Sequence, residues 1–216
     1  MNEIFENLNK IKNLIKDTNV KLIGVSKTKP VSVLKQAYDA GLRDFGENRV
    51  QELVAKIDEL PNDIRWHMIG HLQTNKVKIL LEKEIYLIHS VDSLNLASII
   101  DKYSKLKNKT QNILLEVNVT GEQSKTGYSK DKIIEDMPDL LKLKNIRILG
   151  LMCVAKKDED STKYFKELKN ILKDINTKFK INLKELSMGM TDDYMRAIEC
   201  GSTYIRIGRA IFGERD

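Results

Sequence analysis

The 216-residue sequence is poor in cysteine, proline and aromatic residues, with two cysteines, three prolines and 6% aromatics. Cys153 and Cys200 have neither the paired spacing of a zinc site nor the density of a disulfide scaffold, so we expect two buried free thiols. No run approaches the ~20 apolar residues that cross a bilayer, and no signal-peptide pattern opens the sequence. These absences argue against disulfide-rich and membrane classes and predict a cytoplasmic protein.

Hydrophobic residues make up 41% and charged residues 31% of the sequence, an ordinary balance for a globular chain. The net charge of +6 raises the question of a nucleic-acid partner. Lysines such as Lys102, Lys105, Lys166 and Lys169 are scattered on expected helix surfaces, and no aromatic stripe accompanies them for base stacking. We therefore expect a solvated surface, no nucleic acid and no membrane as partner. No heptad seam is readable, so a monomer is the default expectation.

The opening segment places Ile4, Leu8, Ile11 and Ile15 on one face of a helix. After it, short apolar runs without two-residue alternation, typical of parallel strands buried on both faces, alternate with helical patterns. The expected strands cover residues 20–25, 44–47, 64–69, 85–88, 113–119, 146–154, 186–190 and 204–207. The clearest helical patterns cover residues 33–40, 50–60, 75–81, 94–106, 132–143 and 162–179.

Alternation of strand and helix through the whole sequence indicates an α/β fold. Eight such units after one leading helix favour a closed (β/α)8 TIM barrel with an extra N-terminal helix over an open doubly wound sheet. No linker rich in Pro, Gly or Ser interrupts the pattern, so residues 1–216 are expected to form a single barrel domain.

Chemistry in such barrels is located where the strands end. Lys27 comes directly after the apolar run of the first expected strand, where burial disfavours its charge. A desolvated amine beside another cation is neutral and attacks an aldehyde to give an imine; Lys29 and Arg206 are candidate neighbours. The alternative is an ordinary surface lysine, the commoner case in a sequence with 37 Lys and Arg residues.

Glycine-bearing loops follow the last two expected strands, the usual place for a phosphate group in this architecture. Gly208 precedes an expected helix start, and Gly189 lies just after Ser187. Glycine lets a backbone approach an anion, and N–H groups at a helix start attract it. A tight turn explains the same glycines equally well, and no nucleotide-binding glycine motif is present.

Five motifs mark the expected strand ends and the regions around them. They are GVSKTKP at residues 24–30, FGENRVQE at 45–52, WHMIGHLQTNK at 66–76, LSMGMTDD at 186–193 and GSTYIRIGRAIFGER at 201–215. Together and in this order they resemble the pyridoxal 5′-phosphate (PLP) homeostasis family over nearly the whole sequence. The resemblance implies a fold like the N-terminal barrel domain of bacterial alanine racemase.

The resemblance also implies a cofactor site. PLP would be held as a Schiff base on Lys27, with Asn48 lining the ring pocket and Arg206 facing the pyridine nitrogen. Met190 belongs to the same set of expected cofactor-binding residues. PLP-dependent apo-enzymes are possible recipients of the cofactor.

The phosphate of PLP would be held by Ser187, Gly208 and the backbone of Arg209. Two positions depart from the family's pattern: Thr191 stands where the family often has serine, and Arg209 stands where some members have threonine. A hydroxyl contact at position 209 would therefore be replaced by a cation or by backbone alone.

Arg206 bears on whether such a site is an enzyme. PLP acts as an electron sink, which an acidic partner at the pyridine nitrogen strengthens. Arginine only donates hydrogen bonds, so Arg206 would leave that nitrogen unprotonated and weaken the sink. Racemisation also needs a base on each face of the substrate, and Lys27 supplies one. We therefore expect a PLP carrier that takes part in vitamin B6 homeostasis with little or no turnover of amino acids.

Three alternatives stay open at this stage: a PLP-dependent amino-acid racemase, a barrel acting on a sugar phosphate without PLP, and a nucleic-acid binder. A metal site at His67 and His71 is disfavoured because the residues flank Gly70 at a strand end and lack a zinc-binding helix motif. Asp192 and Asp193 are expected to cap the helix that follows them, with paired acid–base carboxylates as the alternative.

Overall fold

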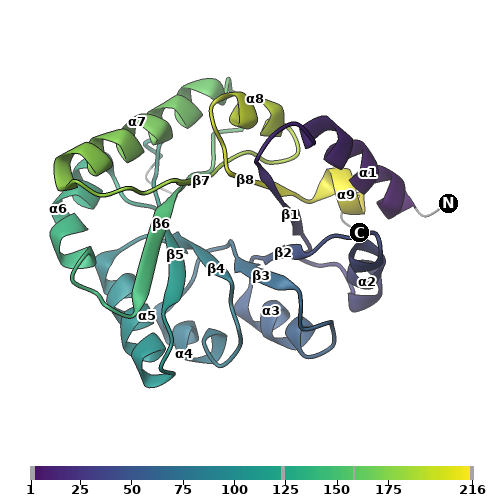
Figure 1. The fold of residues 1–216 in the computed structure, drawn as a ribbon, viewed down its shortest axis with the longest axis horizontal. Coiled ribbons are helices and arrows are strands. Elements are labelled where there is room, and N and C mark those ends of the chain that lie inside the picture. The colour runs from purple at the N-terminus through teal and green to yellow at the C-terminus, as the bar shows by residue number, and fades with distance from the viewer. Residues whose placement is uncertain (1–2, 123–124, 158, 215–216) are drawn as a thin grey trace.

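The structure, a computed structural model, describes residues 3–122, 125–157 and 159–214. Within them, eight parallel strands close into a barrel in sequence order, and helices surround this ring (Figure 1). The last strand, β8, pairs in parallel with the first, β1, which closes the cylinder. The (β/α)8 barrel predicted from the alternating pattern is confirmed. Arg215, at the end of the fifth motif, lies outside the described residues.

The strands are short, as expected for a barrel of this size. They are β1 (Lys21–Val25), β2 (Asp44–Glu47), β3 (Arg65–Met68), β4 (Leu87–Val91), β5 (Gln111–Glu116), β6 (Ile146–Met152), β7 (Glu185–Ser187) and β8 (Tyr204–Ile207).

A helix follows every strand, and one more precedes the barrel. They are α1 (Glu3–Ile15), α2 (Val31–Asp39), α3 (Val50–Ile57), η1 (Thr74–Lys76), α4 (Val77–Leu80), α5 (Leu94–Leu106), α6 (Lys130–Leu140), α7 (Thr162–Phe179), α8 (Tyr194–Glu199) and α9 (Arg209–Phe212). The leading helix α1 packs against α2 and α9 beside the closure of the barrel (Figure 1). Among the described residues, every helix is too short or too polar to span a bilayer.

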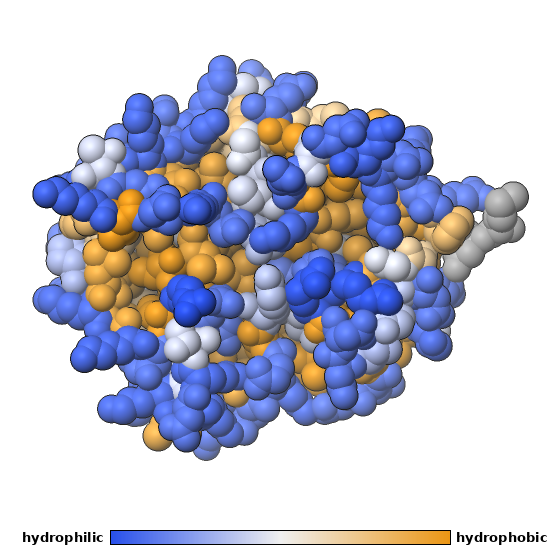
Figure 2. Space-filling view, viewed as in Figure 1, coloured by the Kyte–Doolittle hydropathy of each residue, from blue (hydrophilic) through white to orange (hydrophobic). Residues whose placement is uncertain are grey.

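Two groups of buried apolar side chains stabilise the fold. The larger joins the outward faces of the strands to the helices and includes Leu8, Leu34 and Leu53. The smaller fills the barrel itself and consists of Ile23, Leu87, Leu114, Met152 and Tyr204. Figure 2 shows hydrophilic residues along the outline of the molecule and apolar residues between them.

The barrel is unevenly paired around its circumference. Strands β5 and β6 align at six residue pairs, whereas β7 and β8 align only at Ser187 and Tyr204. The short β7 ends at Ser187 because the chain turns at Gly189, where φ is +95°. The expected strand over residues 186–190 is therefore shorter than predicted.

Candidate functional site

Lys27 lies in the tight turn that follows β1, at the carboxyl end of the barrel. The backbone N–H of Lys29 donates to the carbonyl of Ser26 across 3.1 Å and closes this turn. Thr28 has a φ of +66°, in the left-handed region that β-branched residues rarely adopt. A strained residue therefore follows directly after the predicted cofactor lysine.

Side chains from β2 and α3 hold the turn in place. The Oε2 atom of Glu52 accepts the backbone N–H of Thr28 across 2.9 Å. Lys56 donates to the carbonyl of Ser26 across 2.9 Å and to Oε1 of Glu47 across 2.7 Å. The Ser26 hydroxyl donates to the same Glu47 oxygen across 2.7 Å. We refer to Ser26, Glu47, Glu52 and Lys56 as the turn clamp.

Arg206 on β8 is a buried cation next to β1, with its backbone aligned with that of Ile23. Its Nη1 donates to the Ser187 hydroxyl across 2.5 Å and its Nη2 to the Cys153 carbonyl across 2.9 Å. Within the described part of the chain it forms no ion pair with a carboxylate, and burial lowers its pKa. A buried guanidinium with only neutral partners is unfavourable unless a ligand supplies an acceptor or an anion.

Ser187 is fully buried at the end of β7, and its hydroxyl contacts both Arg206 and the Nδ1 atom of His89, at 2.8 Å. Gly189 is explained by packing, since a Cβ atom there would lie 2.6 Å from that of Ala197 on α8. Asp193 is the N-cap residue of α8, but its carboxylate accepts the backbone N–H of Met190 across 2.7 Å and makes no capping bond to the helix. The expected side-chain cap on α8 is therefore wrong, and Asp193 closes the preceding loop.

The remaining predicted residues lie on the same rim. The buried Oδ1 atom of Asn48 has no hydrogen-bond partner among the described residues. A Cβ atom on Gly208 would lie 3.4 Å from the carbonyl oxygen of Val25, so Gly208 flanks the end of β1. The helix after Gly208 is a single turn of four residues. The guanidinium of Arg209 pairs with Asp192 and Glu214. The predicted phosphate contact at this residue would therefore use its backbone.

The structure thus places Lys27, Asn48, Arg206 and Gly208 on three neighbouring strands, β8, β1 and β2, or in the loops directly after them. Met190 lies farther out and is 40% exposed. It lines a cavity of about 270 Å³ between the loops after β6 and β7, together with Lys156, Asp192, Asp193 and Arg196. A larger cavity of about 520 Å³ lies between the loops after β3 and β4 and includes none of the predicted residues.

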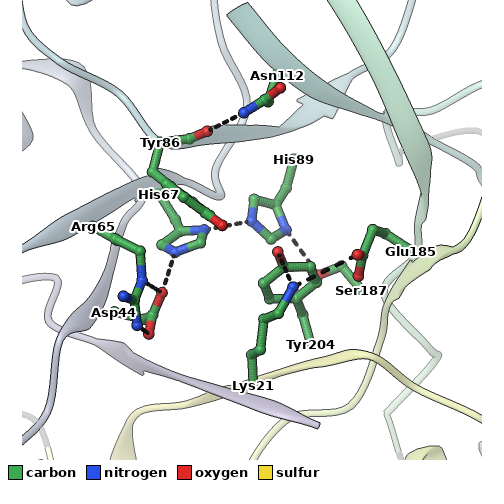
Figure 3. A network of polar contacts seen from close by, with 10 residues as sticks. All are labelled: Lys21, Asp44, Arg65, His67, Tyr86, His89, Asn112, Glu185, Ser187 and Tyr204. Carbon is green, nitrogen blue, oxygen red and sulfur yellow. Dashed lines mark hydrogen bonds and ion pairs between the residues drawn. The ribbon is translucent and has the colours of Figure 1, made fainter. Parts of the chain in front are cut away.

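A row of buried polar side chains inside the barrel was missed by the sequence analysis (Figure 3). His67 lies between Asp44, at 3.1 Å, and His89, at 2.9 Å, and His89 continues the row to Ser187. The sequence gives no sign that His67 and His89 meet. Inward-facing positions on β2, β3, β4 and β7 bring them together. His71, in contrast, lies outside at the rim beside Asp92, and no cluster of three metal-binding side chains occurs among the described residues.

A family model described as alanine racemase, N-terminal domain, matches residues 1–216. The chain belongs to this family. Among curated relatives, the pyridoxal phosphate homeostasis protein of Aquifex aeolicus is 44% identical over 90% of this chain and 87% of its own. The pyridoxal phosphate homeostasis protein of Synechocystis is 42% identical over 91% of this chain and 92% of its own.

Two solved structures agree with the barrel. PipY of Synechococcus elongatus, solved with PLP bound, is 34% identical and has a TM-score of 0.91 over 97% of this chain and 100% of its own. Alanine racemase of Clostridium difficile is 17% identical, with a TM-score of 0.81 over 99% of this chain and 57% of its own. The second likeness shows the fold alone.

Proposed function

We propose that this protein binds PLP as a Schiff base on Lys27 and serves PLP homeostasis without turning over amino acids. The carrying observation is the pairing of β1 with β8, which aligns the buried Arg206 with Ile23, four residues before Lys27 on the strand that leads into its turn. The names of the curated relatives and the PLP-bound structure of PipY support the same ligand.

The residues of this rim fit PLP chemically. The ligand has an aldehyde for the amine of Lys27, and a ring nitrogen able to accept from the guanidinium of Arg206. Its phosphate would meet the backbone at Gly208 and Arg209. Ser187 was also predicted at the phosphate, but its hydroxyl is bonded to Arg206 and His89, so it would contribute by holding Arg206. The half-buried amide of Asn48, whose buried Oδ1 has no partner among the described residues, can present an oxygen or an NH₂ group to the ring.

The same residues argue against racemase activity. A buried arginine at the ring nitrogen holds no proton that it can give up, so PLP bound there would stabilise a carbanion poorly. The turn clamp holds the backbone at Ser26 and Thr28, on either side of Lys27. Location in the cytoplasm, a monomeric state and delivery of PLP to apo-enzymes complete the proposal.

Incubation of the purified protein with PLP, followed by borohydride reduction and peptide mass spectrometry, tests the lysine. The label should be found on Lys27 in the wild type and should be lost in Lys27→Ala. Lys29→Ala is the matched control, because Lys29 lies in the same turn and donates to the Glu214 carbonyl across 2.7 Å. A visible absorption band that survives in Lys27→Ala would remove Lys27 from this role.

Alanine racemisation by the PLP-loaded protein tests the absence of catalysis. We expect no measurable interconversion of L- and D-alanine under conditions where the label on Lys27 is complete. Turnover at about 1 s⁻¹ or faster, the lower range of ordinary enzymes, would contradict the carrier role.

A further inference from the structure

Inside the barrel, four hydrogen bonds join the cation Arg206 to the anion Asp44 through three neutral side chains. The donor–acceptor distances are 2.5 Å from Arg206 to Ser187 and 2.8 Å from Ser187 to His89. They are 2.9 Å from His89 to His67 and 3.1 Å from His67 to Asp44. We call these five residues the interior relay; Figure 3 shows four of them, from Asp44 to Ser187.

The two charged ends fix the direction of every bond in the relay. Arginine can only donate, so the Ser187 oxygen accepts from Arg206 and the single Ser187 hydrogen goes to Nδ1 of His89. His89 must then carry its hydrogen on Nε2 and donate to Nδ1 of His67. His67 in turn carries its hydrogen on Nε2 and donates to Asp44.

The chemical environment supports neutral histidines between ionised ends. Both rings are fully buried, and burial lowers the pKa of His67 and of His89. Burial favours the protonated acid at Asp44, but the hydrogen bonds of Arg65 and His67 outweigh it and lower the pKa of Asp44 to about 2. Arg65 binds both carboxylate oxygens, at 2.8 and 2.5 Å, where the relay reaches the amino end of the barrel.

We infer that the interior relay is a positioning device, which orients the Arg206 guanidinium so that it donates to the ring nitrogen of the ligand and keeps a proton off that atom. The inference rests on the proposed PLP site. Ser187 is the link that touches Arg206, while His89, His67 and Asp44 act through it. Each of the three middle residues donates one hydrogen bond and accepts another. The Ser187 hydroxyl therefore cannot rotate without breaking its bond to His89.

The first test needs no ligand. In ¹⁵N NMR spectra of histidine-labelled protein at neutral pH, His67 and His89 should both be neutral with the hydrogen on Nε2. The variant His71→Gln removes the third histidine of the sequence, which is exposed, and leaves two ring signals to assign. A hydrogen on Nδ1 of either ring, or a doubly protonated ring, would overturn the relay.

The second test measures PLP labelled with ¹⁵N in its ring, bound to variants whose thermal unfolding stays close to that of the wild type. In Ser187→Ala and Asp44→Leu the ring nitrogen signal should move toward the protonated position. PLP affinity should fall about 10-fold, as for the loss of one ordinary hydrogen bond. Asp44→Asn keeps an acceptor oxygen for His67 and should restore the wild-type signal.

Ser202→Ala is the matched control. Ser202 is a buried serine just before β8, and among the described residues its hydroxyl donates only to the backbone carbonyls of Leu186, Met188 and Tyr204. The ring nitrogen signal of PLP bound to Ser202→Ala should equal that of PLP bound to the wild type. An unchanged signal in Ser187→Ala would overturn the positioning role. Absence of PLP binding in the wild type, with both histidines in the expected form, would refute the proposed function and leave the relay's hydrogen-bond order standing.

Discussion

The backbone N–H of Thr28 donates to the Glu52 side chain across 2.9 Å, and this bond holds a threonine at a φ of +66°. A left-handed conformation costs an L-residue about 1–2 kcal/mol, so the turn keeps it only while neighbouring contacts require it. Glu52, on α3, therefore controls the backbone directly after Lys27 from outside the rim.

Glu52→Ala should loosen this turn more than it destabilises the fold. The loss of one hydrogen bond predicts a free energy of unfolding lower by about 1 kcal/mol, and PLP affinity should fall about 10-fold because Lys27 is less well positioned. Urea denaturation and PLP titration measure the two effects. Glu59→Ala, an exposed glutamate after the same helix, is the control and should change neither. Unchanged PLP affinity in Glu52→Ala would contradict the role of the clamp.

Lys56→Met should be among the more destabilising substitutions in this chain. Glu47 is fully buried, and its Oε1 accepts from Lys56 across 2.7 Å. Burial already raises the pKa of Glu47, and removal of its cationic partner leaves a buried carboxylate that costs about 3–5 kcal/mol. Chemical denaturation should show this loss, with Lys16→Met at an exposed position as the control. The double variant Glu47→Gln, Lys56→Met should recover part of it; if it is no more stable than Lys56→Met, the unpaired charge is not the cause.

Stability should fall as the solution is acidified below pH 6.5. Burial depresses the pKa of His67 and of His89 below the usual 6.5, so the unfolded chain takes up protons that the folded chain does not. Each histidine that stays neutral in the fold then removes up to about 1.4 kcal/mol of stability per pH unit below its unfolded pKa.

Urea denaturation between pH 7 and pH 5 measures this slope. His89→Asn should flatten it by about one proton, and the exposed control His71→Gln should leave the contribution of the buried pair intact. The depressed pKa of Asp44, about 2, adds a second loss that begins only as the pH falls below 3.8 toward that value. An unchanged slope in His89→Asn would mean that His89 is protonated in the fold.

Gly189→Ala and Gly213→Ala separate two costs of replacing a glycine. Both residues have positive φ angles, +95° and +78°, so each substitution carries a backbone cost of about 1–3 kcal/mol. Only at Gly189 would the new Cβ atom crowd its surroundings, at 2.6 Å from the Cβ atom of Ala197. We expect Gly189→Ala to cost about 1–3 kcal/mol more than Gly213→Ala in denaturant titrations. Equal costs would show that the α8 packing yields freely.

The sequence predicted the order of elements well because buried parallel strands and amphipathic helices leave different patterns. The helices α5 and α7 have the predicted limits, and all eight strands occur near their predicted positions. The fourth helix was predicted as one segment over 75–81, but it is a short 3-10 helix followed by a single α-helical turn. Such a change of helix type leaves no periodic signal in the sequence.

The site could be predicted only as far as its motifs reached. The relay joins residues 22 apart, His67 and His89, and residues 98 apart, His89 and Ser187. Such contacts are set by strand alignment around the cylinder, which no spacing in the sequence reveals. The burial of Lys56 was equally unreadable, because a lysine on an amphipathic helix ordinarily faces water.

The pairing of β7 with β8, at a single aligned residue pair, is the weakest strand pairing in the barrel. It lies next to the rim where a cofactor phosphate would bind. A ligand that binds the loops after both strands would link them and stabilise this pairing. Backbone amides of β7 and β8 should therefore exchange with deuterium faster than those of β5 and β6 in the apo-protein. Saturating PLP should slow that exchange most strongly at this pairing.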